Sequence, residues 1–447
     1  MIPWIIGAIL GFFCGHYFSV GRGQAVLLAL TGGTLGILAI APLTLYLDSA
    51  AMLLLDISVL LGFEVLLLLL IIGMAGCFML FRSRSLHLAL STLYLFLLVI
   101  FLTYSISLVP VSSWDFLSFW GVRAKDLIEH IDSGTGESFV YNHPHPVTLI
   151  AISAWAGMAN AQGASYPVLA SIWAMLACST LGGIFLYAKM RGCSTFSASL
   201  CSLLLLTMPL YENHLLLTGY AELPLITLTT LATIWLVIGR ESHNRILVAL
   251  AIMLALITIY MKNTGYFYGG SIISAYFLSL LCKKVSDRFA IPLKTACIWI
   301  ILALISLSCA SIVAVLSLGI SLDDINLAGY ASFTQPATHL ILKNILSALV
   351  VKASFSVSIL LFLAYLLTIS FAPRITATAV FLAFLCLIYF LGAIAIQLTD
   401  HGSEFGAWNS DSSYTRVLLP MMALAPLLLA QMIADIKPCT KQTRLPD

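Results

Sequence analysis

Charged side chains are scarce in this sequence. Asp, Glu, Lys and Arg together make up 9% of its residues, whereas a soluble globular domain carries roughly 25%. So few charges cannot cover the water-facing surface of a chain of 447 residues, which excludes a soluble globular protein. The basic residues form no cluster of the kind that binds nucleic acid, so no nucleic-acid partner is expected.

Cysteine motifs and phosphate-binding loops are also missing. The ten cysteines form no Cys-x-x-Cys pair and lie in apolar runs or near their ends, where a thiol behaves as a small hydrophobe. This pattern supports neither a disulfide framework nor a zinc site. No Gly-rich nucleotide-binding loop occurs, and no repeat, linker or low-complexity segment divides the chain. We therefore expect a single domain over 1–447.

Long apolar runs, by contrast, recur along the whole chain. Hydrophobic residues make up 61% of it, and the mean hydropathy is +1.05. The runs span about 17–30 residues, enough for a helix to cross roughly 30 Å of hydrocarbon. They predict an all-α integral membrane protein, a polytopic bundle of about 12–14 transmembrane helices. The predicted helices lie near 1–20, 25–46, 51–81, 86–109, 146–162, 167–188, 195–211, 221–239, 245–260, 265–282, 290–320, 341–371, 375–398 and 416–436.

Lys and Arg concentrate in alternate breaks between the apolar runs. Since short loops rich in these residues stay in the cytoplasm, the following breaks are predicted to be cytoplasmic: 81–85, 189–191, 239–245, 282–288, Arg374 and 437–444. The acidic breaks are predicted to lie outside: 110–145, 211–222, 321–340 and 399–415. Segment 146–162 interrupts the alternation, so it is either re-entrant, a partial span, or evidence of a wrong helix assignment.

These features predict a multi-pass protein of the plasma membrane or inner membrane, with a cytoplasmic C-terminus. The N-terminal run lacks the basic region and the cleavage site of a signal peptide. We therefore expect residues 1–20 to form a first membrane helix.

The outer loop 110–145 carries acids, bases and tryptophans close together. A cap at Ser113 or Asp115 predicts a short helix that continues to about His130. Its apolar positions form one stripe, which suits a membrane interface. The stripe comprises Phe116, Trp120, Leu127 and Ile131. The alternative is that Asp115 only caps the helix and that the stripe only packs against protein.

Helical phase separates the two basic residues of this predicted helix. At about 100° per residue, Arg123 returns to within about 20° of Phe116, on the apolar stripe, whereas Lys125 falls about 180° away. A charge on such a stripe needs a partner, and an anionic lipid phosphate suits a guanidinium group. The phase predicts that Arg123 binds a donor phosphate and that Lys125 faces water. Alternatively, Arg123 pairs with a structural acid.

Other charged residues stand at the predicted outer mouths of helices. Glu222 begins one helix, Lys262 follows the next hairpin, and Arg416 begins the last helix. An ionisable residue in such a place is a candidate functional residue, although a lysine can also simply snorkel. Converging acids and bases suit a substrate with a hydroxyl to deprotonate and a phosphate to hold. Weaker candidates for binding an acceptor or a metal are His143, His145 and Glu404.

Several of these motifs occur in an order typical of one enzyme superfamily. In chain order they read Trp114-Asp115 through Trp120 and Arg123-Ala124-Lys125, His143-Pro144-His145-Pro146, Tyr220-Ala221-Glu222-Leu223-Pro224, Lys262-Asn263-Thr264-Gly265, and a late Arg416. This order resembles the GT-C superfamily of integral-membrane glycosyltransferases, which use polyprenyl-phosphate-linked sugars. The resemblance covers 110–270 and the last helix. It implies a GT-C-like core over 86–436, with extra helices over 1–85 and short interfacial helices in loop 110–145.

The resemblance also implies a reaction on the extracytoplasmic side and roles for four residues. Asp115 would be the general base that deprotonates an acceptor hydroxyl. Lys262 and Arg416 would hold the donor phosphate, which Arg123 is also expected to bind from its helical phase, and Glu222 would orient the acceptor or share a divalent cation. The implied partners are a polyprenyl-phosphate-linked sugar donor, a glycan or lipid acceptor, and the lipid bilayer. No cofactor is assigned, with a divalent metal as the open alternative.

Two other functions also fit a polytopic chain. An O-antigen polymerase or ligase acts on lipid-linked glycans, but such enzymes rely on arginine-rich outer loops, whereas loop 110–145 carries five acids and two bases. A lipid-linked sugar transporter or flippase is favoured by Asp56 and Glu64 within 51–81, since buried acids can mark an ion path. Candidate residues gathered at helix mouths on one side favour the transferase instead.

Overall fold

Helices are the only regular structure in the ten stretches of chain that the computed structural model describes. These stretches are residues 2–17, 21–40, 120–132, 148–158, 167–208, 220–262, 264–317, 353–372, 375–397 and 419–436. The prediction of an all-α chain is confirmed for these residues. The predicted helices over 51–81 and 86–109 lie outside them.

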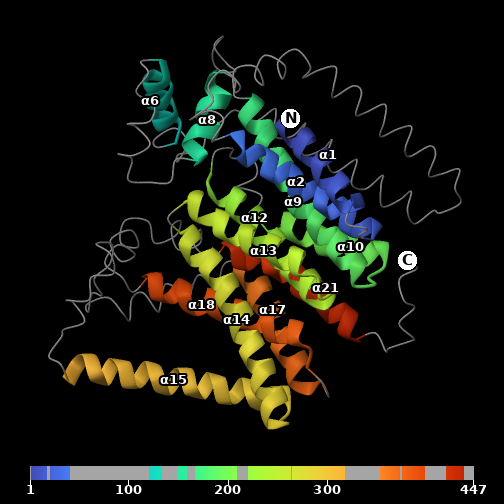
Figure 1. The fold of residues 1–447 in the computed structure, drawn as a ribbon, viewed down its shortest axis with the longest axis vertical. Coiled ribbons are helices and arrows are strands. Elements are labelled where there is room, and N and C mark those ends of the chain that lie inside the picture. Colours follow the sequence, from blue (N-terminus) through green and yellow to red (C-terminus); the bar gives the residue numbers. More distant parts are fainter. Residues whose placement is uncertain are drawn as a thin grey trace, which may run out of the picture.

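The described helices agree with most of the predicted runs. Figure 1 labels α1 (Ile2–Tyr17), α2 (Arg22–Leu38), α6 (Gly121–Asp132), α8 (Thr148–Met158), α9 (Pro167–Met190), α10 (Thr195–Leu206), α12 (Glu222–Glu241), α13 (Arg245–Ile257), α14 (Gly265–Phe289), α15 (Leu293–Ser317), α17 (Ala353–Phe371), α18 (Ala377–Gln397) and α21 (Leu419–Ile436). A 3-10 helix, η2 (Thr258–Tyr260), follows α13. The apolar run that predicts a helix over 167–188, for example, forms α9.

Three helices in the described part of the chain are long and apolar enough to cross a membrane. They are Ile172–Met190, Glu222–Glu241 and Gly265–Phe289. Shorter apolar helical stretches accompany them: Trp4–Gly15, Gly23–Leu38, Thr195–Leu206, Arg245–Tyr260, Leu293–Ser306, Val357–Phe371, Ala377–Gly392 and Met422–Asp435. Helices of this composition are compatible with a lipid bilayer as their surroundings.

Helix α12 is enclosed by other helices (Figure 1). Every residue from Glu222 to Gly239 is buried, and α12 packs against α9, α13, α14 and α21. A helix that is apolar on all sides is the kind that a bundle encloses. Three buried threonines satisfy their hydroxyl groups within the helix, each by donating to the carbonyl oxygen four residues earlier: Thr227, Thr229 and Thr233.

The two ends of α12 differ in their chemistry. Glu222 begins the helix, and Arg240 and Glu241 end it. Its 20 residues, at about 1.5 Å each, make the helix about 30 Å long. This length equals the thickness of a typical hydrocarbon core. The two charged ends of α12 are therefore one membrane thickness apart.

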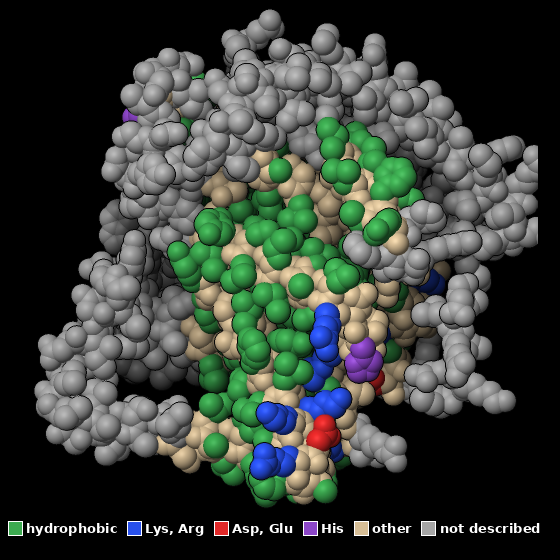
Figure 2. Space-filling model, viewed as in Figure 1, with side chains coloured by type: hydrophobic (Ala, Val, Ile, Leu, Met, Phe, Trp, Pro, Cys, Tyr) green, Lys and Arg blue, Asp and Glu red, His purple; other side chains and the backbone are tan. Residues whose placement is uncertain are grey.

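The end of α12 at Glu241 is tied to its neighbours by charge. Arg191 donates from Nη1 and Nη2 to the two carboxylate oxygens of Glu241, at 2.7 and 2.8 Å. The hydroxyl group of Thr378 donates to Glu241 Oε1 at 2.7 Å. These bonds join the ends of α9, α12 and α18. Figure 2 shows Lys, Arg and His side chains gathered toward one end of the described surface, beside a broad apolar area.

Helix α14 is longer than predicted. The sequence predicts its end at 282, but the helix continues to Phe289, so the basic stretch 282–288 is helical. Lys and Arg are good helix formers, so their charge does not end a helix. Ala290 ends it, in the left-handed conformation with φ of 48°, and Pro292 follows, as is common after a helix C-terminus.

Candidate functional site

Two of the predicted site residues form an ion pair. Lys262 Nζ donates to Glu222 Oε1 at 2.7 Å, although the two residues are 40 positions apart. The side chain of Glu222 is 5% exposed and that of Lys262 is 26% exposed. A carboxylate in the first turn of α12 also interacts favourably with the helix dipole. The structure therefore brings together a buried acid and a partly exposed base.

The hairpin of α12 and α13 makes this pairing possible. Asn244 caps α13 by accepting hydrogen bonds from the backbone N–H groups of Ile246 and Leu247, at 3.0 and 3.3 Å. Helix α13 then packs back along α12. Together α13 and η2 return the chain to the end of α12 where Glu222 lies. Lys262 lies two residues after the end of η2 and thus reaches Glu222.

The turn that carries Lys262 is tightly closed. Gly265 N donates to the carbonyl oxygen of Lys262 at 2.8 Å, and the hydroxyl group of Thr258 donates to the carbonyl oxygen of Gly265 at 2.9 Å. A Cβ atom on Gly265 would collide with the carbonyl oxygen of Thr258. The Lys-x-x-Gly spacing thus has a packing reason, because only glycine lets η2 and α14 approach this closely.

We expect Gly265→Ala to lower the free energy of unfolding by about 1–3 kcal/mol, since the new methyl group forces η2 and α14 apart. Chemical unfolding of the purified protein in mixed micelles measures this. Gly270→Ala is a matched control on the same helix, because a Cβ atom there meets nothing within 4 Å. Equal stability of the two variants would contradict the close-approach explanation.

The entry to α12 is anchored on α9. The indole Nε1 of Trp173 donates to the carbonyl oxygen of Tyr220 at 3.2 Å, and Trp173 is buried. Since Tyr220 lies two residues before Glu222, this bond holds the start of the helix on which the acid stands. Sequence reasoning missed Trp173 because it lies in the middle of an apolar run. Its residue type could have indicated a structural hydrogen bond, since a buried indole N–H usually needs an acceptor.

Helix α6 confirms the predicted stripe in its described part. Trp120 and Leu127 are buried, Arg123 is half-buried and Lys125 is exposed, as the helical phase predicts. The helix ends at Asp132, close to the predicted end at about His130. It packs against α8 (Figure 1), so here the stripe contacts protein, as in the alternative to the interface interpretation. The predicted start at Ser113 or Asp115 lies outside the described residues.

The other predicted site residues also lie outside the described part of the chain, so their roles stay predictions. They are Asp115, His143, His145, Glu404 and Arg416. Among the described residues, no three His, Cys, Asp or Glu side chains are grouped so that they could hold a metal ion. The prediction of His143 and His145 as metal ligands is not tested by this observation.

No protein-family profile, curated protein or solved structure matches the chain. Its residues are therefore the basis for assigning a function. They offer an ion pair between a buried acid and a partly exposed base at the start of an enclosed helix, and an amphipathic helix, α6, that packs on α8.

Proposed function

We propose that this chain is a multi-pass membrane glycosyltransferase with a GT-C-like core. It moves a sugar from a polyprenyl-phosphate donor to a hydroxyl group of an extracytoplasmic glycan or lipid. The observation that carries the proposal is the Glu222–Lys262 pair, which presents a positioned, partly exposed ammonium group at the start of α12. A lipid-linked donor needs a cation for its phosphate at such a helix mouth.

The position of the pair supports an outer active site. Basic side chains gather at the other end of α12, where Arg191, Arg240 and Arg245 lie. Basic loops favour the cytoplasmic side of a membrane. Glu222 and Lys262, about 30 Å away along α12, then face the outside. In this arrangement the protein resides in the plasma membrane or inner membrane with its C-terminus in the cytoplasm.

The ion pair refines the role of Glu222. In this proposal Glu222 does not orient the acceptor, because its carboxylate already accepts a hydrogen bond from Lys262 Nζ at 2.7 Å. Glu222 is thus a positioning residue for Lys262. An ammonium group has three N–H donors, so Lys262 can donate to Glu222 and to a phosphate oxygen of the donor at the same time.

The proposed reaction is a single displacement at the anomeric carbon. Asp115 accepts the proton of the acceptor hydroxyl, whose oxygen forms the new bond to the sugar. The bond between the anomeric carbon and the phosphate oxygen breaks, and polyprenyl phosphate leaves with inversion at the sugar. Lys262, Arg123 and Arg416 offset the negative charge on the departing phosphate.

Mass spectrometry of cell-surface glycans, with and without the gene, tests the function. A transferase of this kind predicts that deletion removes one sugar substituent from a glycan or lipid. Wild-type protein should restore it and the Asp115→Asn variant should not. A change in polymer length would instead indicate a polymerase or ligase. Restoration that depends on Asp56 and Glu64 but not on Asp115 would indicate a transporter or flippase.

We expect Arg123→Ala to lower the rate of sugar transfer about 10–100-fold, the effect of losing a hydrogen bond to a charged group. Lys125→Ala should lower it less than about fivefold, because an exposed charge contributes little. Arg123→Lys should recover only part of the activity, since the two-pronged guanidinium geometry is lost. The measurement is the initial rate of polyprenyl-phosphate release by purified protein.

Thermal unfolding of the same variants is the control. Arg123→Ala should unfold close to the wild-type temperature. A loss of stability that parallels the loss of activity would show that Arg123 pairs with a structural acid. Equal rates for the two alanine variants would show that the assignment from helical phase is wrong.

A further inference from the structure

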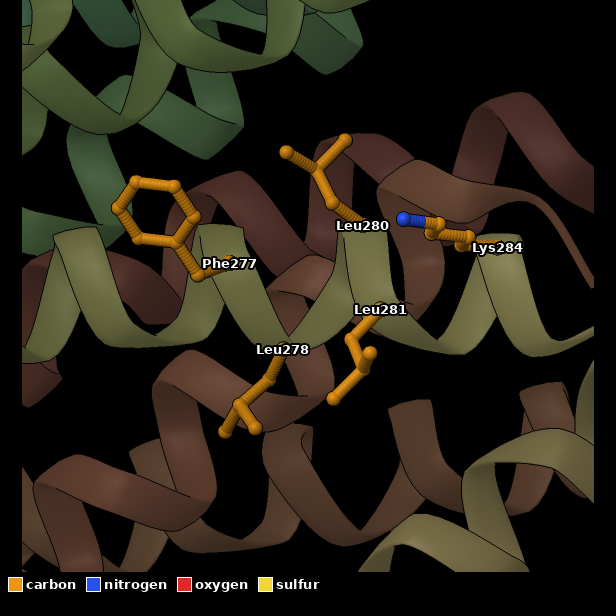
Figure 3. A pocket seen from close by; sticks show the side chains of 5 residues that line it. All are labelled: Phe277, Leu278, Leu280, Leu281 and Lys284. Atoms are coloured by element: carbon orange, nitrogen blue, oxygen red, sulfur yellow. The ribbon is translucent and has the colours of Figure 1, made fainter.

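An open apolar groove lies on the exposed surface of α14, away from the Glu222–Lys262 pair. Its volume is about 370 Å³. Figure 3 shows the side chains of Phe277, Leu280 and Lys284 along one edge and those of Leu278 and Leu281 along the other. One cationic side chain therefore stands at the end of a groove that is otherwise lined by hydrocarbon.

The chemistry of this face changes along the helix. Phe277, Leu280 and Leu281 are 59%, 36% and 46% exposed. Lys284 and Arg288, both exposed, follow on the same face of α14 toward its C-terminus, since residues four apart lie one above the other. The face is thus apolar for little more than one turn and then carries two cations over little more than one turn.

The neighbouring charged residues differ in position. Lys283 is turned by about 100° from Lys284 along the helix, whereas Asp287, three residues after Lys284, lies about 60° from it and beside the basic pair. Both are exposed. Residues 283–288 therefore include three basic residues and one acidic residue. Two of the three basic residues share the face of the groove. The C-terminal dipole of a helix favours basic residues, but it does not require an open apolar groove before them.

We propose that this groove binds an anionic phospholipid. An acyl chain lies along Phe277, Leu280 and Leu281, and the headgroup phosphate contacts Lys284 and Arg288. The order of the lipid, hydrocarbon and then negative charge, is complementary to the order of this face. The proposal rests on the membrane placement proposed above, in which this end of α14 meets the anionic cytoplasmic leaflet. It does not depend on sugar transfer.

Lipid retention by the full chain tests the proposal. The protein is reconstituted in phosphatidylcholine nanodiscs with a minor fraction of phosphatidylglycerol, extracted into detergent, and its retained lipids are quantified by mass spectrometry. Wild-type protein should be enriched in phosphatidylglycerol relative to the nanodisc. Lys284→Ala should lower this enrichment about fivefold, the effect of one basic residue near an anionic surface. The matched control Lys283→Ala should lower it less than twofold.

Two further measurements test whether the apolar residues contribute to binding and whether the bound anion is a lipid headgroup or free phosphate. Phe277→Ala should also lower the enrichment, and inorganic phosphate should not displace the bound lipid. Retention of both lipids in nanodisc proportions, equal losses in Lys283→Ala and Lys284→Ala, or displacement by inorganic phosphate would each overturn the proposal. Because the assay contains no sugar donor, its outcome is distinct from failure of the proposed transferase activity.

Discussion

Lys262→Met is expected to lower the free energy of unfolding by about 3 kcal/mol, because it removes the ion-pair partner of a buried carboxylate. The value is at the lower end of the usual range, since the side chain of Lys262 is 26% exposed and part of the charge interaction is screened. Chemical unfolding in mixed micelles measures it. Methionine keeps the length of the stem, so the packing changes little and the charge is the main loss.

The double variant Lys262→Met with Glu222→Gln separates stability from function. Removing both charges should restore most of the stability, because no buried carboxylate then lacks its cation. Binding of polyprenyl phosphate should stay weak in the double variant, since the cation for the phosphate is still missing. Wild-type stability of Lys262→Met alone would contradict the pairing. Wild-type phosphate binding by the double variant would leave Lys262 with a structural role only.

Asp115→Asn is expected to lower the rate of sugar transfer by about 10²–10⁴-fold, the usual effect of losing a general base. The amide has the same shape as the carboxylate but cannot accept the proton of the acceptor hydroxyl. Expression and donor binding should stay close to those of the wild type. The measurement is polyprenyl-phosphate release by purified protein with a saturating donor.

Asp126→Asn is the matched control for Asp115→Asn. It makes the same chemical change within the same predicted outer loop, on α6, and should transfer sugar at a rate near that of the wild type. Wild-type turnover by Asp115→Asn would remove Asp115 from the mechanism. Equal losses in both variants would indicate that the loop depends on its net charge rather than on one base.

The helices were predictable where an apolar run has clear ends. Helix α9 follows the apolar run from Pro167, and α12 begins within one residue of its predicted start. The predicted end of α14 was wrong because the charged residues after 282 were interpreted as a loop. Charged residues end an apolar run but not a helix, and α14 continues until Ala290 adopts a left-handed conformation. Such an ending at alanine has no signal of the kind that glycine provides.

The candidate site was predictable in its members but not in its contacts. Residues at helix mouths could be recognised from charge in an apolar chain, which identified Glu222 and Lys262. Their ion pair depends on how α12 and α13 pack and on the tight turn at Gly265, and neither is visible in local sequence. Consequently, the sequence alone offered either a phosphate ligand or a snorkelling lysine at position 262, whereas the ion pair indicates that loss of Lys262 also lowers the stability of the fold.

The hydroxyl groups bonded within α12 have a consequence for biogenesis. As the chain is synthesised, α12 precedes α13, α14 and α21, so during insertion its surface meets lipid before these partners exist. Because Thr227, Thr229 and Thr233 donate to carbonyl oxygens of the same helix, lipid exposure leaves these hydroxyls bonded. These three hydroxyls therefore add no unpaired donor to α12 as it enters the bilayer, whereas Thr230 of the same helix has no hydrogen-bond partner among the described residues. The ion pair of α12 forms only after 40 more residues, when synthesis reaches Lys262.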